Sequence, residues 1–211
     1  YDRYGAQGGD WGAGISRDLG VIDADHVLGV HLNMLLTFQP ADATDLTEEE
    51  NARLARLGQY DAELAGYMKI QATRPQTLAY GLTDSPTGLL AWIVEKFKEW
   101  TDSAAVPEDA VDRDVILTNV TLYWLTATAG SSARIYYETV HATGLRRQEP
   151  SATPTGVAVF PADLFLPIRR FAELTNNIVQ WSEFDRGGHF PAMEVPDLFT
   201  GDVRAFFRRL R

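Results

Sequence analysis

Gly8-Gly9-Asp10-Trp11-Gly12 is the stretch of sequence that decides the fold. It has the glycine spacing of the G-x-S-x-G nucleophile elbow, with aspartate in the place of serine. In such an elbow a strand turns abruptly into a helix, and the central residue is held in a strained conformation that presents its side chain to the active site. A carboxylate is already nucleophilic at neutral pH, so Asp10 can attack an electrophilic carbon and form an ester.

Three further apolar runs, residues 27–32, 156–161 and 177–181, are typical of buried parallel strands. Asp163 follows the second run, and His189 follows the third. The order along the chain is therefore nucleophile, acid, histidine, which is the order expected of an α/β-hydrolase. The sequence predicts a mostly parallel sheet flanked by helices.

The composition restricts the chemistry. The chain has no cysteine, so thiol nucleophiles, disulfides and cysteine-based metal sites are excluded. A formal net charge of −10 disfavours nucleic acid as a partner, because non-specific binding to phosphates depends on basic clusters. No apolar run approaches the roughly 20 residues that a membrane-spanning helix needs, and no secretory signal opens the sequence.

A long helix-rich insertion separates the two parts of the sheet. We predict core at residues 1–40, a helical lid at residues 41–148 and core again at residues 149–211. Thr47 and Glu50 have the spacing of a capping box, and Ser85 is placed to cap a second helix that continues to Trp100. Residues 149–154 have the composition of a linker back into the sheet.

Together these motifs resemble those of epoxide hydrolases of the microsomal type, within the α/β-hydrolase superfamily. The resemblance extends over nearly the whole chain, although the family often carries glutamate where this chain has Asp163. The matching segments are residues 7–12, 66–71, 84–89, 117–119, 131–136, 160–163 and 186–190.

The resemblance implies hydrolysis of an epoxide to a vicinal diol through a covalent aspartyl ester, with no metal or organic cofactor. Asp10 is the implied nucleophile, and Tyr67 and Tyr136 are the implied phenols that hydrogen-bond the epoxide oxygen. His189 then activates water, and Asp163 orients the imidazole. Epoxide and water are the expected partners.

Several neighbouring residues compete for these roles. The backbone N–H of Trp11, one residue after the nucleophile, is the expected oxyanion donor. Tyr137 is the rival of Tyr136, which we prefer from the register of residues 131–134. The rival acids are Glu183, Asp185 and Asp42, and we prefer Asp163 for its place after a strand. We expect structural roles for His26, His31 and His141, although His31 can also line the pocket.

The beginning of the chain leads us to expect a missing N-terminal segment. Tyr1 lies inside the predicted strand that leads into the elbow, so the preceding half of the sheet, on the order of 150–200 residues, is expected elsewhere. In the family that segment supplies a second oxyanion donor and often a membrane anchor. Without an anchor, we expect a cytoplasmic bacterial protein, and a homo-oligomer is compatible with the sequence.

Two other functions share parts of this pattern. A haloalkane dehalogenase also carries an aspartate elbow, but it needs N–H donors for a departing halide, whereas an epoxide oxygen needs a proton. A catalytically inactive hydrolase fold used for binding would have no need of all five site residues. Detoxification and natural-product biosynthesis are equally compatible with the sequence, which identifies no particular epoxide.

Overall fold

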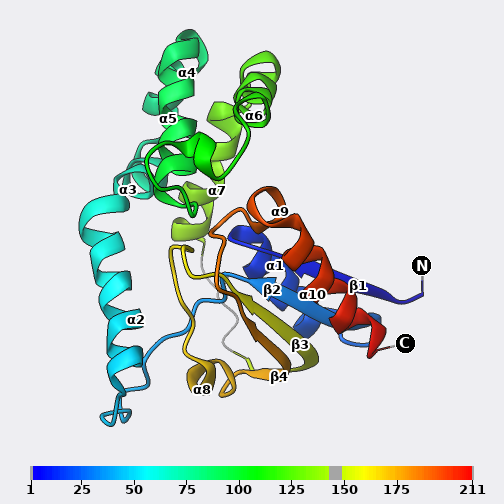
Figure 1. The fold of residues 1–211 in the computed structure, drawn as a ribbon. Coiled ribbons are helices and arrows are strands. Elements are labelled where there is room, and N and C mark those ends of the chain that lie inside the picture. Colours follow the sequence, from blue (N-terminus) through cyan, green and yellow to red (C-terminus); the bar gives the residue numbers. More distant parts are fainter. Residues whose placement is uncertain (1, 143–148, 211) are drawn as a thin grey trace. The chain divides into compact units, whose positions relative to one another are not determined.

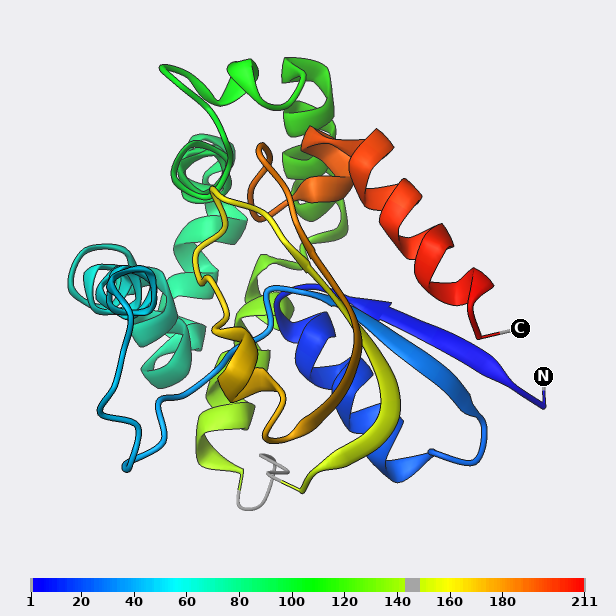
Figure 2. The same ribbon diagram turned by 60° about the horizontal axis from the view of Figure 1, so that its bottom comes forward.

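The computed structural model describes residues 2–142 and 149–210. In it the chain forms two compact units, one of Tyr1–Leu57 with Arg147–Arg211 and one of Gly58–Arg146. The first unit is a parallel sheet with helices on both faces, and the second is helical (Figures 1 and 2). Residues 41–57, which we predicted to belong to the insertion, therefore cluster with the sheet unit.

The described part of the sheet unit alternates strands and helices, as in other α/β folds. Its two short helices, α8 and α9, lie in the loops after β3 and β4. The elements are β1 (Tyr4–Gly8), α1 (Trp11–Ile22), β2 (Val27–Asn33), the greater part of α2 (Glu48–Gln59), β3 (Ser151–Val159), α8 (Arg169–Ala172), β4 (Asn176–Glu183), α9 (Pro191–Glu194) and α10 (Pro196–Arg208).

The strand order is β1-β2-β3-β4, and all three neighbouring pairs are parallel, as predicted. Gly8 at the end of β1 is opposite Leu32, and Val159 at the end of β3 is opposite Glu183 at the end of β4. Because parallel strands end at one edge of a sheet, the loops that follow β1, β3 and β4 meet there. This edge brings together three segments that are far apart in the sequence.

Residues of β2 alternate between the two faces of the sheet, as strand geometry requires. Val30 lies against α1, where a Cβ added to Gly20 would come within 3.3 Å of it. Gly29, and Gly156 of β3, which is opposite His31, face α10 instead. An added Cβ on Gly156 would lie 2.7 Å from the ring of Phe206. The absence of side chains at these positions lets α10 pack closely on the sheet face opposite α1 (Figure 2).

The linker predicted at residues 149–154 is wrong from Ser151 onward, because β3 begins there. The hydroxyl of Thr153 donates a hydrogen bond to the carbonyl of Gly20, which ties this end of the strand to α1. Pro154 lies at an irregularity in the register with β4, before the residues that pair with β2. A strand tolerates proline at such a position because no ladder hydrogen bond from its nitrogen is required.

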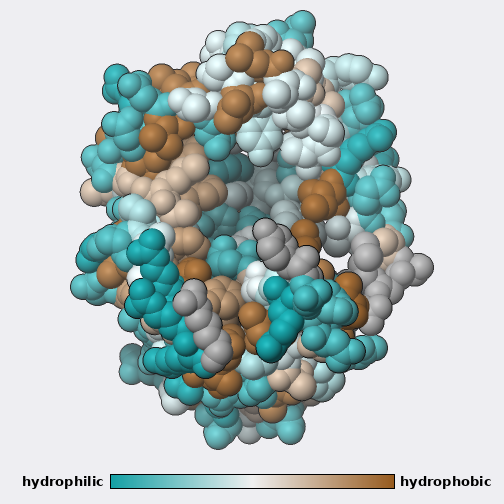
Figure 3. Space-filling view, turned by 90° about the vertical axis from the view of Figure 1, so that its right-hand side faces the viewer, coloured by the Kyte–Doolittle hydropathy of each residue, from teal (hydrophilic) through white to brown (hydrophobic). Residues whose placement is uncertain are grey.

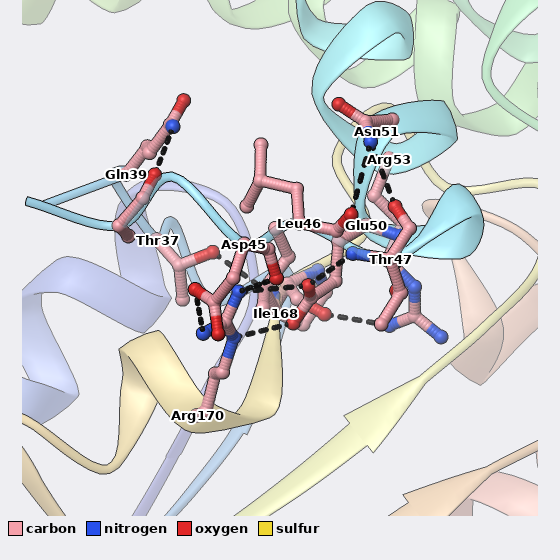
Figure 4. A network of polar contacts seen from close by, with 12 residues as sticks. Thr37, Gln39, Asp45, Leu46, Thr47, Glu50, Asn51, Arg53, Ile168 and Arg170 are labelled. Atoms are coloured by element: carbon pink, nitrogen blue, oxygen red, sulfur yellow. Dashed lines mark hydrogen bonds and ion pairs between the residues drawn. The ribbon is translucent and has the colours of Figure 1, made fainter.

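The capping box predicted at the start of α2 is confirmed. Glu50 N–H donates to Thr47 Oγ1 at 3.1 Å, and Thr47 N–H donates to Glu50 Oε2 at 2.9 Å. Figure 4 shows that Glu50 also accepts hydrogen bonds from Arg170, which follows the loop after β3. These hydrogen bonds attach the first turn of α2 to α8. They explain why the first part of α2 belongs to the sheet unit.

The second unit consists of η1, a π-helical turn (Tyr60–Leu64), α3 (Gly66–Thr73), α4 (Pro75–Asp84), α5 (Pro86–Glu99), η2, a 3₁₀ turn (Pro107–Asp109), α6 (Arg113–Thr126) and α7 (Ala129–His141). Its described core includes Leu82, Leu89 and Val120. The predicted cap of α5 is confirmed, since Gly88 N–H donates to Ser85 Oγ at 2.9 Å. Helices α3 and α4 both pack against α7.

Hydrophobic side chains are exposed at several separate places on the described surface. On the face drawn in Figure 3, they are interspersed with hydrophilic residues. Ile15 and Ile22 on α1 and Leu122 and Leu125 on α6 are examples, each more than half exposed. Among the described residues, no helix is both long and apolar enough to cross a membrane.

Candidate active site

The strand β1 turns into the helix α1 at Asp10, as the elbow motif predicts. Asp10 has φ 52° and ψ −126°, a strained conformation for a residue other than glycine. A Cβ added to Gly8 would lie 1.9 Å from the carbonyl oxygen of Gly12, so only glycine fits where the strand meets the first turn of the helix. The chain thus holds the Asp10 carboxylate at the carboxyl edge of the sheet, beside the start of α1.

His189 lies between Asp10 and Asp163. Its Nε2 is 2.9 Å from Asp10 Oδ2, and its Nδ1 is 2.8 Å from Asp163 Oδ1. The ring follows Gly187, whose φ of 95° favours glycine and turns the chain back after β4. The structure therefore brings together three side chains that the sequence places on three different loops.

Asp163 is fixed by the loop after β3. Its side chain is 2% exposed, and Oδ1 also accepts a hydrogen bond from the backbone N–H of Leu164 at 2.7 Å. Two arginines of α2 bind the same loop: Arg53 donates to the carbonyl of Pro167 at 2.6 Å, and Arg56 donates to that of Pro161 at 2.8 Å. Both ends of the loop that carries Asp163 are therefore attached to α2.

The surroundings of His189 favour its charged form. Burial lowers the pKa of the imidazole, but hydrogen bonds and charge from Asp10 and Asp163 outweigh it and raise the pKa from 6.5 to about 9. At neutral pH the ring is consequently an imidazolium that donates to both carboxylates. Neutralisation of either carboxylate would remove one of the causes of this raised pKa.

The rival acids have other surroundings. Glu183 accepts hydrogen bonds from Trp181 Nε1 at 2.7 Å and from Arg53 at 2.9 Å. Burial raises the pKa of Glu183, but these two hydrogen bonds lower it below its usual value overall. Asp42 is exposed, and Asp185 has 89% of its side chain exposed. The carboxylate beside His189 Nδ1 is that of Asp163.

The other histidines lie in different surroundings from His189. His31 is fully buried on β2, with Nε2 2.8 Å from Asp202 Oδ2 on α10, and it packs against the ring of Phe206. His26 pairs with Asp23 in the turn before β2, and His141 stacks on Tyr137. A structural role for each of these three histidines stays a prediction.

Tyr67 and Tyr136 meet in the second unit. Tyr67 is the second residue of α3 and is buried, Tyr136 lies on α7, and their rings are 5.8 Å apart in an edge-to-face arrangement. Tyr137 is exposed and stacks on His141 instead, with ring centroids 4.1 Å apart. Of the two adjacent tyrosines of α7, the preferred Tyr136 is the one beside Tyr67.

Sequence reasoning missed three residues around these groups. The hydroxyl of Tyr60 is 2.8 Å from that of Tyr67, and the ammonium of Lys96 is 4.6 Å from the centre of the Tyr67 ring. Arg56 beside the Asp163 loop was also missed. No motif marks these residues, since each acquires its neighbour through a turn or a helix crossing that sequence spacing does not reveal.

No protein-family model matches the chain. Over its full length, however, it is 46% identical to a putative epoxide hydrolase of Stigmatella aurantiaca and covers 48% of that protein. It is 35% identical to epoxide hydrolase 1 of Sus scrofa, over 98% of this chain and 51% of that protein. The chain is a homologue of these epoxide hydrolases along almost its whole length. It spans about half the length of the curated relatives that it matches.

Solved epoxide hydrolases share the fold of this homologue. The structure of Aspergillus niger epoxide hydrolase has a TM-score of 0.86 at 32% identity, over 100% of this chain and 53% of that one. The juvenile hormone epoxide hydrolase of the silkworm Bombyx mori has a TM-score of 0.89 at 31% identity, over 100% and 55%. The prediction of an α/β-hydrolase fold from the elbow and the residue order is confirmed.

Proposed function

We propose that this chain carries the catalytic residues of an epoxide hydrolase that forms a vicinal diol through an ester on Asp10. The observation that supports this best is the strained elbow with His189 between Asp10 and Asp163. Homology to epoxide hydrolases supports the same reaction. The chain spans about half the length of these relatives, and the reaction is proposed for the protein that contains it.

In the first step, an oxygen of Asp10 attacks a carbon of the epoxide, and the electron pair of the breaking C–O bond moves to the ring oxygen. Tyr67 and Tyr136 are proposed to hydrogen-bond that oxygen, and one of them gives it a proton. Donors aimed at a developing negative charge stabilise the transition state more than the ground state. We propose the helical segment of residues 41–148 as the lid that carries both phenols.

In the second step, water attacks the carbonyl carbon of the Asp10 ester. Esterification neutralises Asp10, which removes one of the causes of the raised pKa of His189 and makes the ring a better base for water. The imidazolium first loses its proton, which replaces the one that a tyrosine gave to the epoxide oxygen. The neutral ring then accepts a proton from the attacking water and gives it to the departing diol oxygen. The acid proton of the restored Asp10 finally returns the ring to its charged form. The Trp11 N–H, in the first turn of α1, is the proposed oxyanion donor.

The reaction requires no redox change, since an electron pair moves from the carboxylate to carbon and water restores the carboxylate. We accordingly propose a mechanism without a metal or an organic cofactor. Haloalkane dehalogenation is not favoured, because the homologues are epoxide hydrolases and the proposed donors are phenols. Detoxification and biosynthesis require different epoxides, so a screen of an epoxide panel would distinguish the two roles.

The decisive experiment traps the ester. In His189→Gln of the full protein, Asp10 remains nucleophilic but its ester lacks the base for hydrolysis, so one equivalent of epoxide should add to the peptide that contains Asp10. Turnover should fall by a factor of about 10² to 10⁴. Asp10→Ala in the same assay should form no adduct.

A single turnover of the parent protein in heavy-oxygen water tests the same proposal without a mutation. The label should appear first in the Asp10 carboxylate, since water attacks the carbonyl carbon and the diol leaves with an oxygen from the protein. Label in the first diol with none in Asp10 would show direct attack of water on the epoxide. Absence of both adduct and turnover with a broad epoxide panel would favour an inactive binding module.

A further inference from the structure

A buried hydrogen bond joins Tyr60 and Tyr67. Their hydroxyl oxygens are 2.8 Å apart, and the two side chains are 5% and 9% exposed. A hydroxyl can donate one hydrogen bond and accept two, so Tyr67 can accept from Tyr60 while it donates its own proton elsewhere. In the opposite direction, Tyr67 would donate its proton to Tyr60. The Tyr60 hydroxyl also lies 3.9 Å from Met68 Sδ, but a thioether sulfur is a weaker acceptor than the Tyr67 oxygen.

The π-helical turn η1 begins at Tyr60 and ends before Tyr67. Ala65 N–H donates to the carbonyl of Tyr60 at 2.9 Å, which is the wide i to i+5 bond of a π-helix, and α3 begins immediately afterward at Gly66. In an uninterrupted α-helix, residues seven apart would be separated by about 10 Å along the axis. The irregular turn instead brings their hydroxyls into contact, and π-helical turns often occur at functional sites.

A positive charge lies over the Tyr67 ring. The Lys96 ammonium is 4.6 Å from the centre of that ring and 5.6 Å from the centre of the Trp100 ring, and its side chain is only 12% exposed. Lys96 also pairs with Glu95. A cation near an aromatic face is attracted to its electrons, and the attraction grows as negative charge develops on the phenol oxygen.

We propose that Tyr60 is a positioning residue that donates its hydroxyl to the Tyr67 oxygen and thereby makes Tyr67 the stronger of the two proposed acids. The proposal rests on the function proposed above. As Asp10 opens the epoxide, Tyr67 transfers its proton to the ring oxygen, and the hydrogen bond from Tyr60 stabilises the phenolate that is left. Hydrogen bonds to charged groups are about twice as strong as neutral ones, so this bond strengthens as the reaction proceeds.

The test measures ester formation alone, in the His189→Gln protein. Tyr60→Phe removes the donor while it keeps the ring, and it should slow alkylation of Asp10 about tenfold, which corresponds to about 1.4 kcal/mol. In a protein with His189 intact, hydrolysis of the preformed ester should be unchanged. Tyr137→Phe, which removes an exposed phenol on α7, is the matched control and should alkylate at the parent rate.

Double variants separate this role from mere packing. If Tyr60 acts through Tyr67, then Tyr60→Phe should have no further effect on alkylation in Tyr67→Phe and its full effect in Tyr136→Phe. Equal slowing in both backgrounds, or no slowing in the single variant, would overturn the proposal. Alkylation that is slowed by Tyr67→Phe but not by Tyr60→Phe would leave the proposed function intact, whereas no adduct on Asp10 in any variant would reject both.

A second pair of variants tests the donor role even if Tyr60→Phe is too unstable to assay. Tyr60→Gln and Tyr60→Met have similar side-chain size, but only glutamine offers a donor. The glutamine variant should alkylate several times faster than the methionine variant at equal folded fraction, as measured by thermal unfolding. Equal alkylation rates in these two folded variants would contradict a donor role for residue 60.

Discussion

Two glycines of the elbow, Gly8 and Gly12, differ in how much they contribute to stability. A Cβ on Gly8 would lie 1.9 Å from a backbone oxygen, whereas a Cβ on Gly12 meets no described atom within 4 Å outside its chain neighbours and its own helix backbone. Gly8→Ala should therefore lower the free energy of unfolding by about 2–3 kcal/mol. Gly12→Ala should be neutral or stabilising by up to about 1 kcal/mol, since Gly12 is in the first turn of a helix.

Urea unfolding of both variants of the full protein checks this difference. The pair serves as its own control, because each variant adds one methyl group to the same motif. Equal losses of stability would show that the motif spacing, rather than the backbone contact at Gly8, imposes glycine.

The raised pKa of His189 predicts how stability depends on pH. The folded protein holds the imidazolium proton up to a pKa of about 9, whereas the unfolded chain releases it near 6.5. The contribution of His189 is therefore complete below pH 6.5 and is lost as the pH rises through 9. Its size is on the order of 3 kcal/mol, from about 1.4 kcal/mol per pKa unit.

Unfolding free energies of the parent and His189→Gln proteins between pH 6 and 9.5 provide the measurement. The parent should lose stability relative to the variant as the pH rises across this range. Parallel curves would mean that the imidazole is not held in its charged form by Asp10 and Asp163.

At the scale of elements, α2 contacts the loop that carries Asp163 through Arg53 and Arg56. The side chain of Arg53 is 11% exposed, and each arginine donates to a carbonyl at one end of the loop. Because a typical hydrogen bond contributes about 0.5–1.5 kcal/mol, we expect Arg56→Gln to lower the free energy of unfolding by about 1 kcal/mol. A loosened Asp163 should also slow ester hydrolysis more than ester formation.

Single-turnover rates for the two steps, measured in the full protein, check this prediction. Arg169→Gln is the matched control, since Arg169 makes an exposed i, i+4 pair with Glu173 that contributes little to stability. If Arg56→Gln left hydrolysis of the ester unchanged, the contact between α2 and the loop would be structural alone.

For the whole molecule, the order β1-β2-β3-β4 places β1 at an edge of the sheet. Within the described residues, β1 pairs only with β2, and an unpaired strand edge promotes association. We expect this 211-residue chain, expressed alone, to associate or to remain partly folded. A monomer by light scattering, with one cooperative thermal transition, would contradict this expectation.

The elbow, the parallel strands and the helix caps were all predictable from the sequence, because each depends on residues close together in the chain. Glycine spacing, apolar runs and the pair Thr47 and Glu50 act over a few residues, where local sterics and hydrogen bonds decide the conformation. The linker at residues 149–154 was wrong because proline suggested a break, whereas pairing with β4 accommodates Pro154 at a register irregularity.

Long-range contacts decided the rest, since a side chain's partner depends on the packing of distant elements. Glu183 is nearer than Asp163 to His189 in sequence, but it pairs with Trp181 and Arg53, while Asp163 reaches the imidazole across the edge of the sheet. Tyr60 meets Tyr67 only because a π-helical turn changes the helical path between them. The sequence pattern predicted the types of catalytic group, whereas the tertiary packing determined which residues each group contacts.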